Sequence, residues 1–248
     1  MMEDFEMTDL GMMHYFLGIE VVQSPAGISI SQKKYLLGIL DRFLMKECNP
    51  VTTPTEFGVK LSKDNEGKKV NSTLYKQIVG SLMYLTTTRP DIMFSVSLIS
   101  RYMENPTENH LLAAKRILRY LQGTRDFGLF YKKGVMSNLI GFTDSDFAGD
   151  QDDRKSTSGH VFMLGSAAVS WSSKKQPIVT LSTTEAEFVA ATSCACQSIW
   201  LKKILTELRF IQEEAIEIYC DNKNMTIKSG KAESQSQYAE EGFSYPTF

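Results

Sequence analysis

The sequence has few cysteines, few tryptophans and no long uninterrupted run of apolar residues. It holds 4 cysteines and 2 tryptophans among 248 residues. So few cysteines are typical of a reduced intracellular protein rather than a disulfide-stabilised secreted domain. No apolar run approaches the roughly 18 residues that a membrane-spanning helix needs. The first residues are acidic and lack the basic and apolar regions of a signal peptide, so we expect an intracellular protein with no membrane partner.

The sequence also lacks an excess of either charge. Its 27 basic and 29 acidic residues leave a net charge of −2, which excludes a generally basic nucleic-acid-binding protein but allows a local basic patch. Hydrophobic residues make up 42% of the chain and charged residues 23%, values that exclude extensive disorder. The length predicts one large or two small domains with a substantial core.

The first half of the sequence begins with a β-rich segment and continues with helical patterns. Two β-prone runs, Tyr15–Gln23 and Ile28–Ser31, flank a Ser-Pro-Ala-Gly turn and predict a hairpin. An apolar stripe at helical spacing follows it directly and predicts a helix. Residues 46–71 are rich in proline and glycine and show little periodicity, which indicates a linker. Helical periodicity from Ser72 to Gly123 then predicts a connector of three helices.

From Leu129 onward the pattern changes to short strands that alternate apolar and polar residues. A Ser-Thr-Thr-Glu capping box at Ser182 opens a long helix through Leu208. A short helical start is expected at Asn222, and the residues after Gly230 have no periodicity and are expected to be disordered. The expected strands are Leu129–Tyr131, Leu139–Thr143, His160–Leu164, Ala167–Ser172 and Ile216–Cys220.

Three carboxylates stand where separate elements could bring them together. Asp144 and Asp221 each follow an expected strand, and Glu187 lies one turn inside the long helix. Converging carboxylates repel one another unless they are protonated or bridged by a metal ion. A set of oxygen ligands alone suits Mg²⁺ or Mn²⁺, and two such ions ~4 Å apart could promote phosphodiester cleavage. Acids at strand ends are more often solvated loop residues, so spacing alone leaves both interpretations open.

Several motifs resemble the ribonuclease H domain of copia-type retrotransposon polyproteins. They are DSDFAGDQDDRKSTS at 144–158, SWSSKKQ at 170–176, LSTTEAEFVA at 181–190 and YCDN at 219–222. Upstream segments are similar to the region that joins the polymerase palm to that domain. These segments are DLGMMHYFLGIEV at 9–21, GSLMYLTTTRPD at 80–91 and KRILRYLQGT at 115–124. The similarity covers about residues 9–228.

The resemblance implies an α/β fold, namely a truncated ribonuclease H-like mixed sheet with a long helix, preceded by a helical connector and a β-hairpin remnant of a polymerase palm. The implied division is a palm-edge remnant at 1–45, a linker at 46–71, the connector at 72–135, an incomplete ribonuclease H-like domain at 136–230 and a disordered tail at 231–248. It also assigns Asp144, Glu187 and Asp221 as catalytic residues and as ligands for Mg²⁺, with Mn²⁺ as the alternative. Asp146 is a neighbour that could serve the outer shell of that site.

The function implied by this resemblance is cleavage of the RNA strand in an RNA/DNA hybrid by a ribonuclease H-type endonuclease. Contacts to the hybrid or another nucleic acid are expected from Lys115, Arg116, Arg119, Lys132, Lys133, Trp171, Lys174 and Lys175. The Tyr-Val-Asp-Asp motif of the polymerase is absent, so no reverse transcriptase activity is expected. After Asp221 the sequence has no aspartate and no histidine, so a fourth carboxylate, the last strand and the last helix are expected to be missing and activity to be reduced.

An alternative is a catalytically inactive transposon-derived fragment that binds nucleic acid or a protein partner. The run Arg-Ile-Leu-Arg at 116–119 also matches the Arg-x-Leu-Arg pattern of secreted pathogen effectors. It lies in the middle of an expected helix, where an ordinary basic helix face is the simpler interpretation. Similarity to an effector of this kind is therefore expected without physical support for that role.

Overall fold

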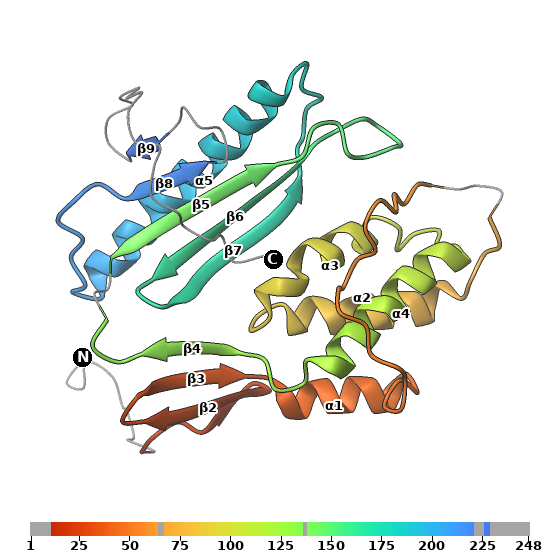
Figure 1. The fold of residues 1–248 in the computed structure, drawn as a ribbon, viewed down its shortest axis with the longest axis horizontal. Coiled ribbons are helices and arrows are strands. Elements are labelled where there is room, and N and C mark those ends of the chain that lie inside the picture. Colours follow the sequence, from red (N-terminus) through yellow and green to blue (C-terminus); the bar gives the residue numbers. More distant parts are fainter. Residues whose placement is uncertain (1–10, 64–66, 136–137, 221–225, 229–248) are drawn as a thin grey trace, which may run out of the picture.

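The computed structural model describes residues 11–63, 67–135, 138–220 and 226–228 (Figure 1). Within these residues the chain forms two β-sheets and five α-helices, so the expected mixed α/β class is confirmed. The strands are β1 (Tyr15–Phe16), β2 (Ile19–Ser24), β3 (Gly27–Ser31), β4 (Leu129–Lys132), β5 (Leu139–Ser145), β6 (Thr157–Leu164), β7 (Ala167–Lys175), β8 (Glu217–Cys220) and β9 (Thr226–Lys228). The helices are α1 (Lys33–Arg42), α2 (Ser72–Leu85), α3 (Met93–Ser100), α4 (Glu108–Gly123) and α5 (Thr183–Glu207), with a 3₁₀ turn at Pro90–Ile92 before α3.

The first sheet has the strand order β1-β2-β3-β4 and is antiparallel throughout. Its β2–β3 hairpin confirms the turn expected between the two β-prone runs. The fourth strand comes from much later in the chain, because β4 pairs with β3 through Ile28 and Tyr131. The strand expected at Leu129–Tyr131, within the connector range, therefore completes the first sheet.

Helix α1 shares one hydrophobic core with the three connector helices. Leu40 of α1, Tyr75 of α2 and Leu118 of α4 are each fully buried in it. The Tyr75 hydroxyl donates a hydrogen bond of 2.8 Å to the Ile99 carbonyl, which satisfies the polar end of this buried ring. None of the helices in the described part of the chain is long and apolar enough to cross a membrane.

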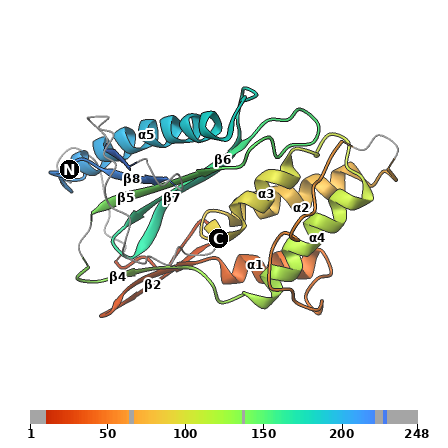
Figure 2. The same cartoon turned by 45° about the horizontal axis from the view of Figure 1, so that its top comes forward.

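The second sheet has the strand order β7-β6-β5-β8-β9, in which only β5 and β8 run parallel. Helix α5 lies on one face, whereas the connector lies on the other side, with α3 next to β7 (Figure 2). The core beneath α5 contains Leu139, Phe162, Cys194 and Ile218. The helical start expected near Asn222 falls outside the described residues, and the described chain resumes as β9 rather than as a helix.

Gly141 provides a sharp test of this core. A Cβ atom there would lie 2.8 Å from Phe162 Cε1 and 3.2 Å from Ile218 Cγ1, and both of those residues are fully buried. We therefore expect Gly141→Ala to lower the free energy of unfolding by about 1–3 kcal/mol, the usual cost of an overpacked core. Urea denaturation measures this change. Gly159→Ala on β6 is the matched control, because its Cβ would meet only the Ser172 carbonyl at 3.7 Å; an equal loss in both variants would contradict the prediction.

Candidate functional site

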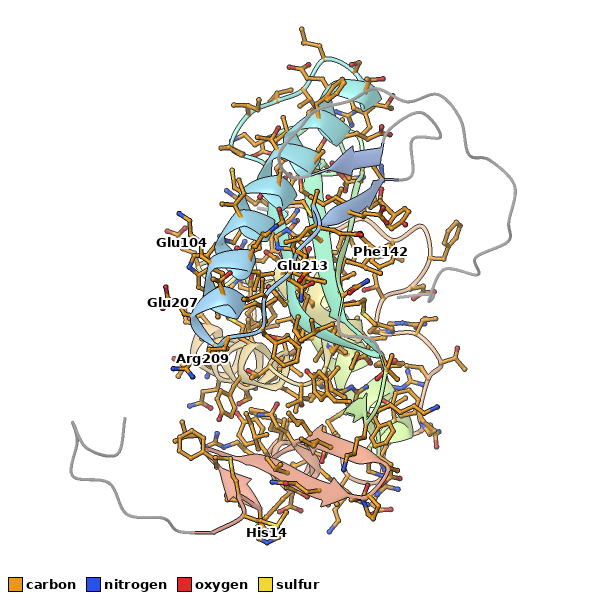
Figure 3. All side chains as sticks on the ribbon, turned by 90° about the vertical axis from the view of Figure 1, so that its left-hand side faces the viewer. His14, Glu104, Phe142, Glu207, Arg209 and Glu213 are labelled. Carbon is orange, nitrogen blue, oxygen red and sulfur yellow. The ribbon has the colours of Figure 1, made fainter. Side chains whose placement is uncertain are left out.

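Asp144 stands near the end of β5 and is exposed. Its Oδ1 accepts a hydrogen bond of 2.7 Å from the backbone N–H of Ser145. Side chains alternate along a strand, and Leu139 of β5 faces α5 in the core. Phe142 lies on the side of the sheet away from α5 (Figure 3). Asp144 shares the face of Phe142, so its carboxylate can meet a group from α5 only around the end of the strand.

Glu187 lies in the first turns of α5, and the cap expected at the start of this helix is confirmed. Ser182 Oγ accepts from the Glu185 N–H at 3.1 Å, and Glu185 Oε2 accepts from the Leu181 N–H at 2.6 Å. The two nearby glutamates therefore differ in role. Glu187 Oε2 is buried and accepts no hydrogen bond from any described residue. A buried carboxylate oxygen without a donor is costly, so its partner is a group that the described residues do not supply.

The third expected carboxylate, Asp221, lies outside the described residues. The preceding residue, Cys220, ends β8 and pairs with Thr143, directly before Asp144. Across the described ranges, no three histidine, cysteine, aspartate or glutamate side chains come together as a metal-binding group. The described part of the expected ligand set therefore consists of Asp144 and Glu187.

Gln176 joins the two elements that carry these carboxylates. It is almost fully buried directly after β7. Its Nε2 donates to the Ala186 carbonyl at 2.9 Å and approaches the hydroxyls of Ser158 and Ser145 at 2.8 and 3.1 Å. Ala186 precedes Glu187, and Ser145 follows Asp144. One side chain thus fixes the start of α5 against the ends of β5 and β6. Sequence analysis assigned no role to this glutamine, because its partners come from three separate elements.

Asp146 stabilises the loop between β5 and β6 through hydrogen bonds to Thr157. Its Oδ1 accepts a hydrogen bond of 2.6 Å from the backbone N–H of Thr157, whose carbonyl in turn accepts from the Asp146 N–H at 3.2 Å. Its carboxylate also fills the space that a Cβ atom at Gly149 would need. These contacts hold the first residue of β6 in place and leave Asp146 with a structural role.

Asp150 ties the same acidic loop to the connector. Its side chain is 1% exposed, and its Oδ2 lies 2.7 Å from Lys175 Nζ and 3.2 Å from Arg101 Nη1. Its Oδ1 accepts from the backbone N–H groups of Asp152 and Asp153. Burial acts to raise the pKa of Asp150. The hydrogen bonds from Lys175 and from the backbone together outweigh this effect, so the pKa is lowered from 3.8 to about 2. The same ion pairs raise the pKa of Lys175 against the opposing effect of its burial.

Four of the eight residues expected to contact nucleic acid are engaged within the protein. Arg116 forms an ion pair with Glu56 at 3.6 Å, and Arg119 donates to the Asn49 carbonyl at 2.8 Å. Lys175 forms an ion pair with Asp150. Trp171 Nε1 donates a hydrogen bond of 3.0 Å to the Thr86 carbonyl of the connector. The remaining side chains, those of Lys115, Lys132, Lys133 and Lys174, are exposed.

The exposed lysines do not form one patch. The Lys132 N–H donates to Ser166 Oγ in the turn between β6 and β7. Lys174 pairs with Ser158 at the opposite end of those strands, close to Asp144. Only Lys174 therefore stands at the end of the second sheet where the candidate carboxylates lie.

The chain is similar to a known protein family and to several known proteins. Residues 1–57 match the family described as reverse transcriptase (RNA-dependent DNA polymerase). The retrovirus-related Pol polyprotein from transposon RE1 of Arabidopsis thaliana is 46% identical over 222 residues, which are 90% of this chain and 15% of that polyprotein. The uncharacterized mitochondrial protein AtMg00810 of the same plant is 40% identical over 196 residues, or 79% of this chain and 81% of that protein. The chain thus spans a small part of the RE1 polyprotein and most of AtMg00810.

A third relative bears on the Arg-x-Leu-Arg pattern and on the identity of the chain. Secreted RxLR effector protein 161 of Plasmopara viticola is 43% identical over 128 residues, which are 51% of this chain and 90% of that protein. In this structure Ile117 and Leu118 are buried in the connector core, and the two flanking arginines bind residues 49–56, so the pattern is part of a packed helix. High identity over nine-tenths of the sequence decides the family. The chain belongs to the copia-type retrovirus-related Pol polyproteins of transposons.

Proposed function

We propose that the second sheet and α5 form a metal-dependent nuclease unit of the ribonuclease H type, which cleaves the RNA strand of an RNA/DNA hybrid. The order of elements supports this proposal: three antiparallel strands, a long helix and a strand parallel to the first. The observation that carries it is Glu187 Oε2, a buried oxygen to which no described residue donates a hydrogen bond, on the helix whose start Gln176 ties to the end of β5.

The residues present fit a hard cation. The candidate ligands are carboxylate oxygens alone, which suits Mg²⁺ or Mn²⁺, and Glu187 Oε2 has no competing donor among the described residues. Asp144 and Glu187 would hold the ion, together with Asp221 as the resemblance implies. When bound, such an ion activates a water molecule and stabilises charge on the phosphodiester.

The supporting residues fix this arrangement from two sides. Gln176 positions α5, and therefore Glu187, against the end of β5. Asp146 and Asp150 hold the acidic loop that follows Asp144. Pre-positioned ligands avoid the cost of ordering mobile side chains when the ion binds, so these contacts favour an organised site.

The test is release of RNA fragments from a hybrid labelled on its RNA strand. We expect the full chain to release fragments in Mg²⁺ or Mn²⁺, and to leave a DNA duplex of the same sequence and single-stranded RNA intact. Chelation with EDTA should stop the reaction, and Asp144→Asn should abolish it. A folded wild-type chain that binds the hybrid but releases no RNA with either metal would overturn the proposal and favour a nucleic-acid-binding fragment without catalysis.

A further inference from the structure

A polar pocket of about 330 Å³ lies between the outer strand β7 and helix α5. Ser170 and Ser172 of β7 line one wall, and Ser193 and Gln197 of α5 line the other. Side chains alternate along a strand, so Ser170, Ser172 and Lys174 share the face of β7 that looks toward α5. Helix α5 packs on β5, β6 and β8, and this leaves the β7 edge of the sheet open beside it (Figure 2).

The lining of the pocket holds one cation, Lys174. Lys174 is exposed at its rim, has no acidic partner in the described part of the chain, and no described lining residue is an aspartate or glutamate. His160 also lines the pocket, and its burial together with the charge of Lys174 lowers its pKa. The imidazole is therefore neutral at pH 7 and keeps one N–H donor. Hydroxyl, amide, imidazole and ammonium donors thus face one space that no carboxylate competes for.

We propose that this pocket binds a backbone phosphate of the nucleic-acid strand on which the chain acts, an inference that rests on the proposed function. A phosphate group offers only acceptors, and this pocket offers a cation and several donors. A lysine ammonium binds phosphate as a point charge, and the serine hydroxyls rotate to donate to its oxygens. Gln197 Nε2 lies 3.3 Å from Ser170 Oγ, a contact long enough to be exchanged for a better acceptor.

Two residues that line the pocket lie on the helix that carries Glu187. Ser193 and Gln197 follow Glu187 along the same helix, at roughly 9 and 15 Å along the axis for a rise of about 1.5 Å per residue. Lys174 precedes Gln176, which fixes α5 beside Glu187. For a strand that runs along α5, with phosphates every ~3.4 Å, the bound phosphate would lie about three to four nucleotides from the cleaved bond.

The experiment measures binding of the full chain to a fluorescein-labelled RNA/DNA hybrid by anisotropy, in EDTA and between about 50 and 200 mM KCl. We expect Lys174→Ala to weaken binding severalfold and to reduce the slope of log K against log salt by about 0.7–1, the value for one lost phosphate contact. Ser193→Glu should weaken binding at least as much, because it adds a carboxylate to the rim. Inorganic phosphate should compete better against the wild type than against Lys174→Ala at equal ionic strength.

Lys203→Ala is the matched control, since Lys203 is exposed on the same helix beyond the pocket and does not line it. Its salt slope should equal that of the wild type. Equal slopes for Lys174→Ala and Lys203→Ala would overturn the pocket proposal. Because no metal is present, the result is independent of cleavage: a changed slope without RNA release in the metal assay overturns the proposed function alone.

Discussion

Glu187→Gln is expected to reduce metal-dependent cleavage of the hybrid by about 100-fold or more and to raise the stability of the metal-free chain. A lost ligand removes several kcal/mol of transition-state stabilisation, and each ~1.4 kcal/mol is tenfold in rate. In the absence of metal, the same substitution removes charge from a buried oxygen to which no described residue donates. This relief should raise the free energy of unfolding by about 1 kcal/mol. Single-turnover cleavage and thermal denaturation in EDTA measure the two effects.

Glu185→Gln is the matched control, two residues earlier on α5. Glu185 accepts the Leu181 N–H at the start of the helix, where a negative charge is favourable. Its loss should lower the free energy of unfolding by about 0.3–1 kcal/mol and leave cleavage intact. The two glutamates should therefore change stability in opposite directions. Full cleavage by Glu187→Gln would remove this residue from the site.

Asp150→Ala is expected to lower the free energy of unfolding by about 3 kcal/mol, because it removes the buried carboxylate that two cations share. Of the other contacts, Arg101 then keeps the Thr157 hydroxyl and Lys175 keeps Asp153. Lys175 and Arg101 both lie within 3.2 Å of the Asp150 carboxylate, whose side chain is 1% exposed. Arg101 belongs to the connector, so docking of the connector on the second sheet should loosen. Trp171 reports this docking, since its indole donates to the Thr86 carbonyl, and its emission should shift to the red.

Asp152→Ala serves as the control for Asp150→Ala. Asp152 is exposed and accepts a hydrogen bond of 2.9 Å from the Lys63 N–H, so its removal should cost less than about 1 kcal/mol. A similar loss in both variants, or unchanged Trp171 emission in Asp150→Ala, would contradict the assigned role of this carboxylate.

The Asp150 network also predicts how stability depends on pH. The folded state lowers the pKa of Asp150 from 3.8 to about 2, so folding favours the ionised carboxylate. This contribution is fully present above about pH 4 and is lost as the pH falls toward 2. Denaturation of the wild type in that range should show a steeper loss of stability than Asp150→Asn, which lacks the titrating group. Parallel pH profiles for the two proteins would refute the assignment.

The elements that sequence analysis predicted are those whose pattern is local. Alternation along β5, β6 and β7 and the Ser182 cap of α5 can each be read from a few neighbouring residues, and the structure confirms them. The partner of β4 could not be predicted in this way, because pairing with β3 depends on residues far away in the chain. The burial of Asp150 was equally hidden, since one of its partners is Arg101, which directly follows α3.

For the candidate site, sequence analysis named candidate residues but did not predict their surroundings. Asp144 and Glu187 were identified from their positions after a strand and inside a helix, together with the family resemblance. Gln176 was missed because an uncharged side chain gives no periodic or charge signal. Trp171 was expected on a nucleic-acid surface, but the composition of β7 gives no sign that its indole binds the connector.

The late arrival of β4 has a consequence for synthesis of the chain. Until Leu129–Lys132 leaves the ribosome, β3 has an edge of unpaired backbone N–H and C=O groups, because four helices separate it from its partner. Such an edge is a template for strands of other molecules. Nascent chains that stall within the connector should therefore associate through β3, and a chaperone or the early packing of α1 would protect them. The first sheet can therefore be completed only after the ribosome has translated β4, which lies between the connector and the second sheet.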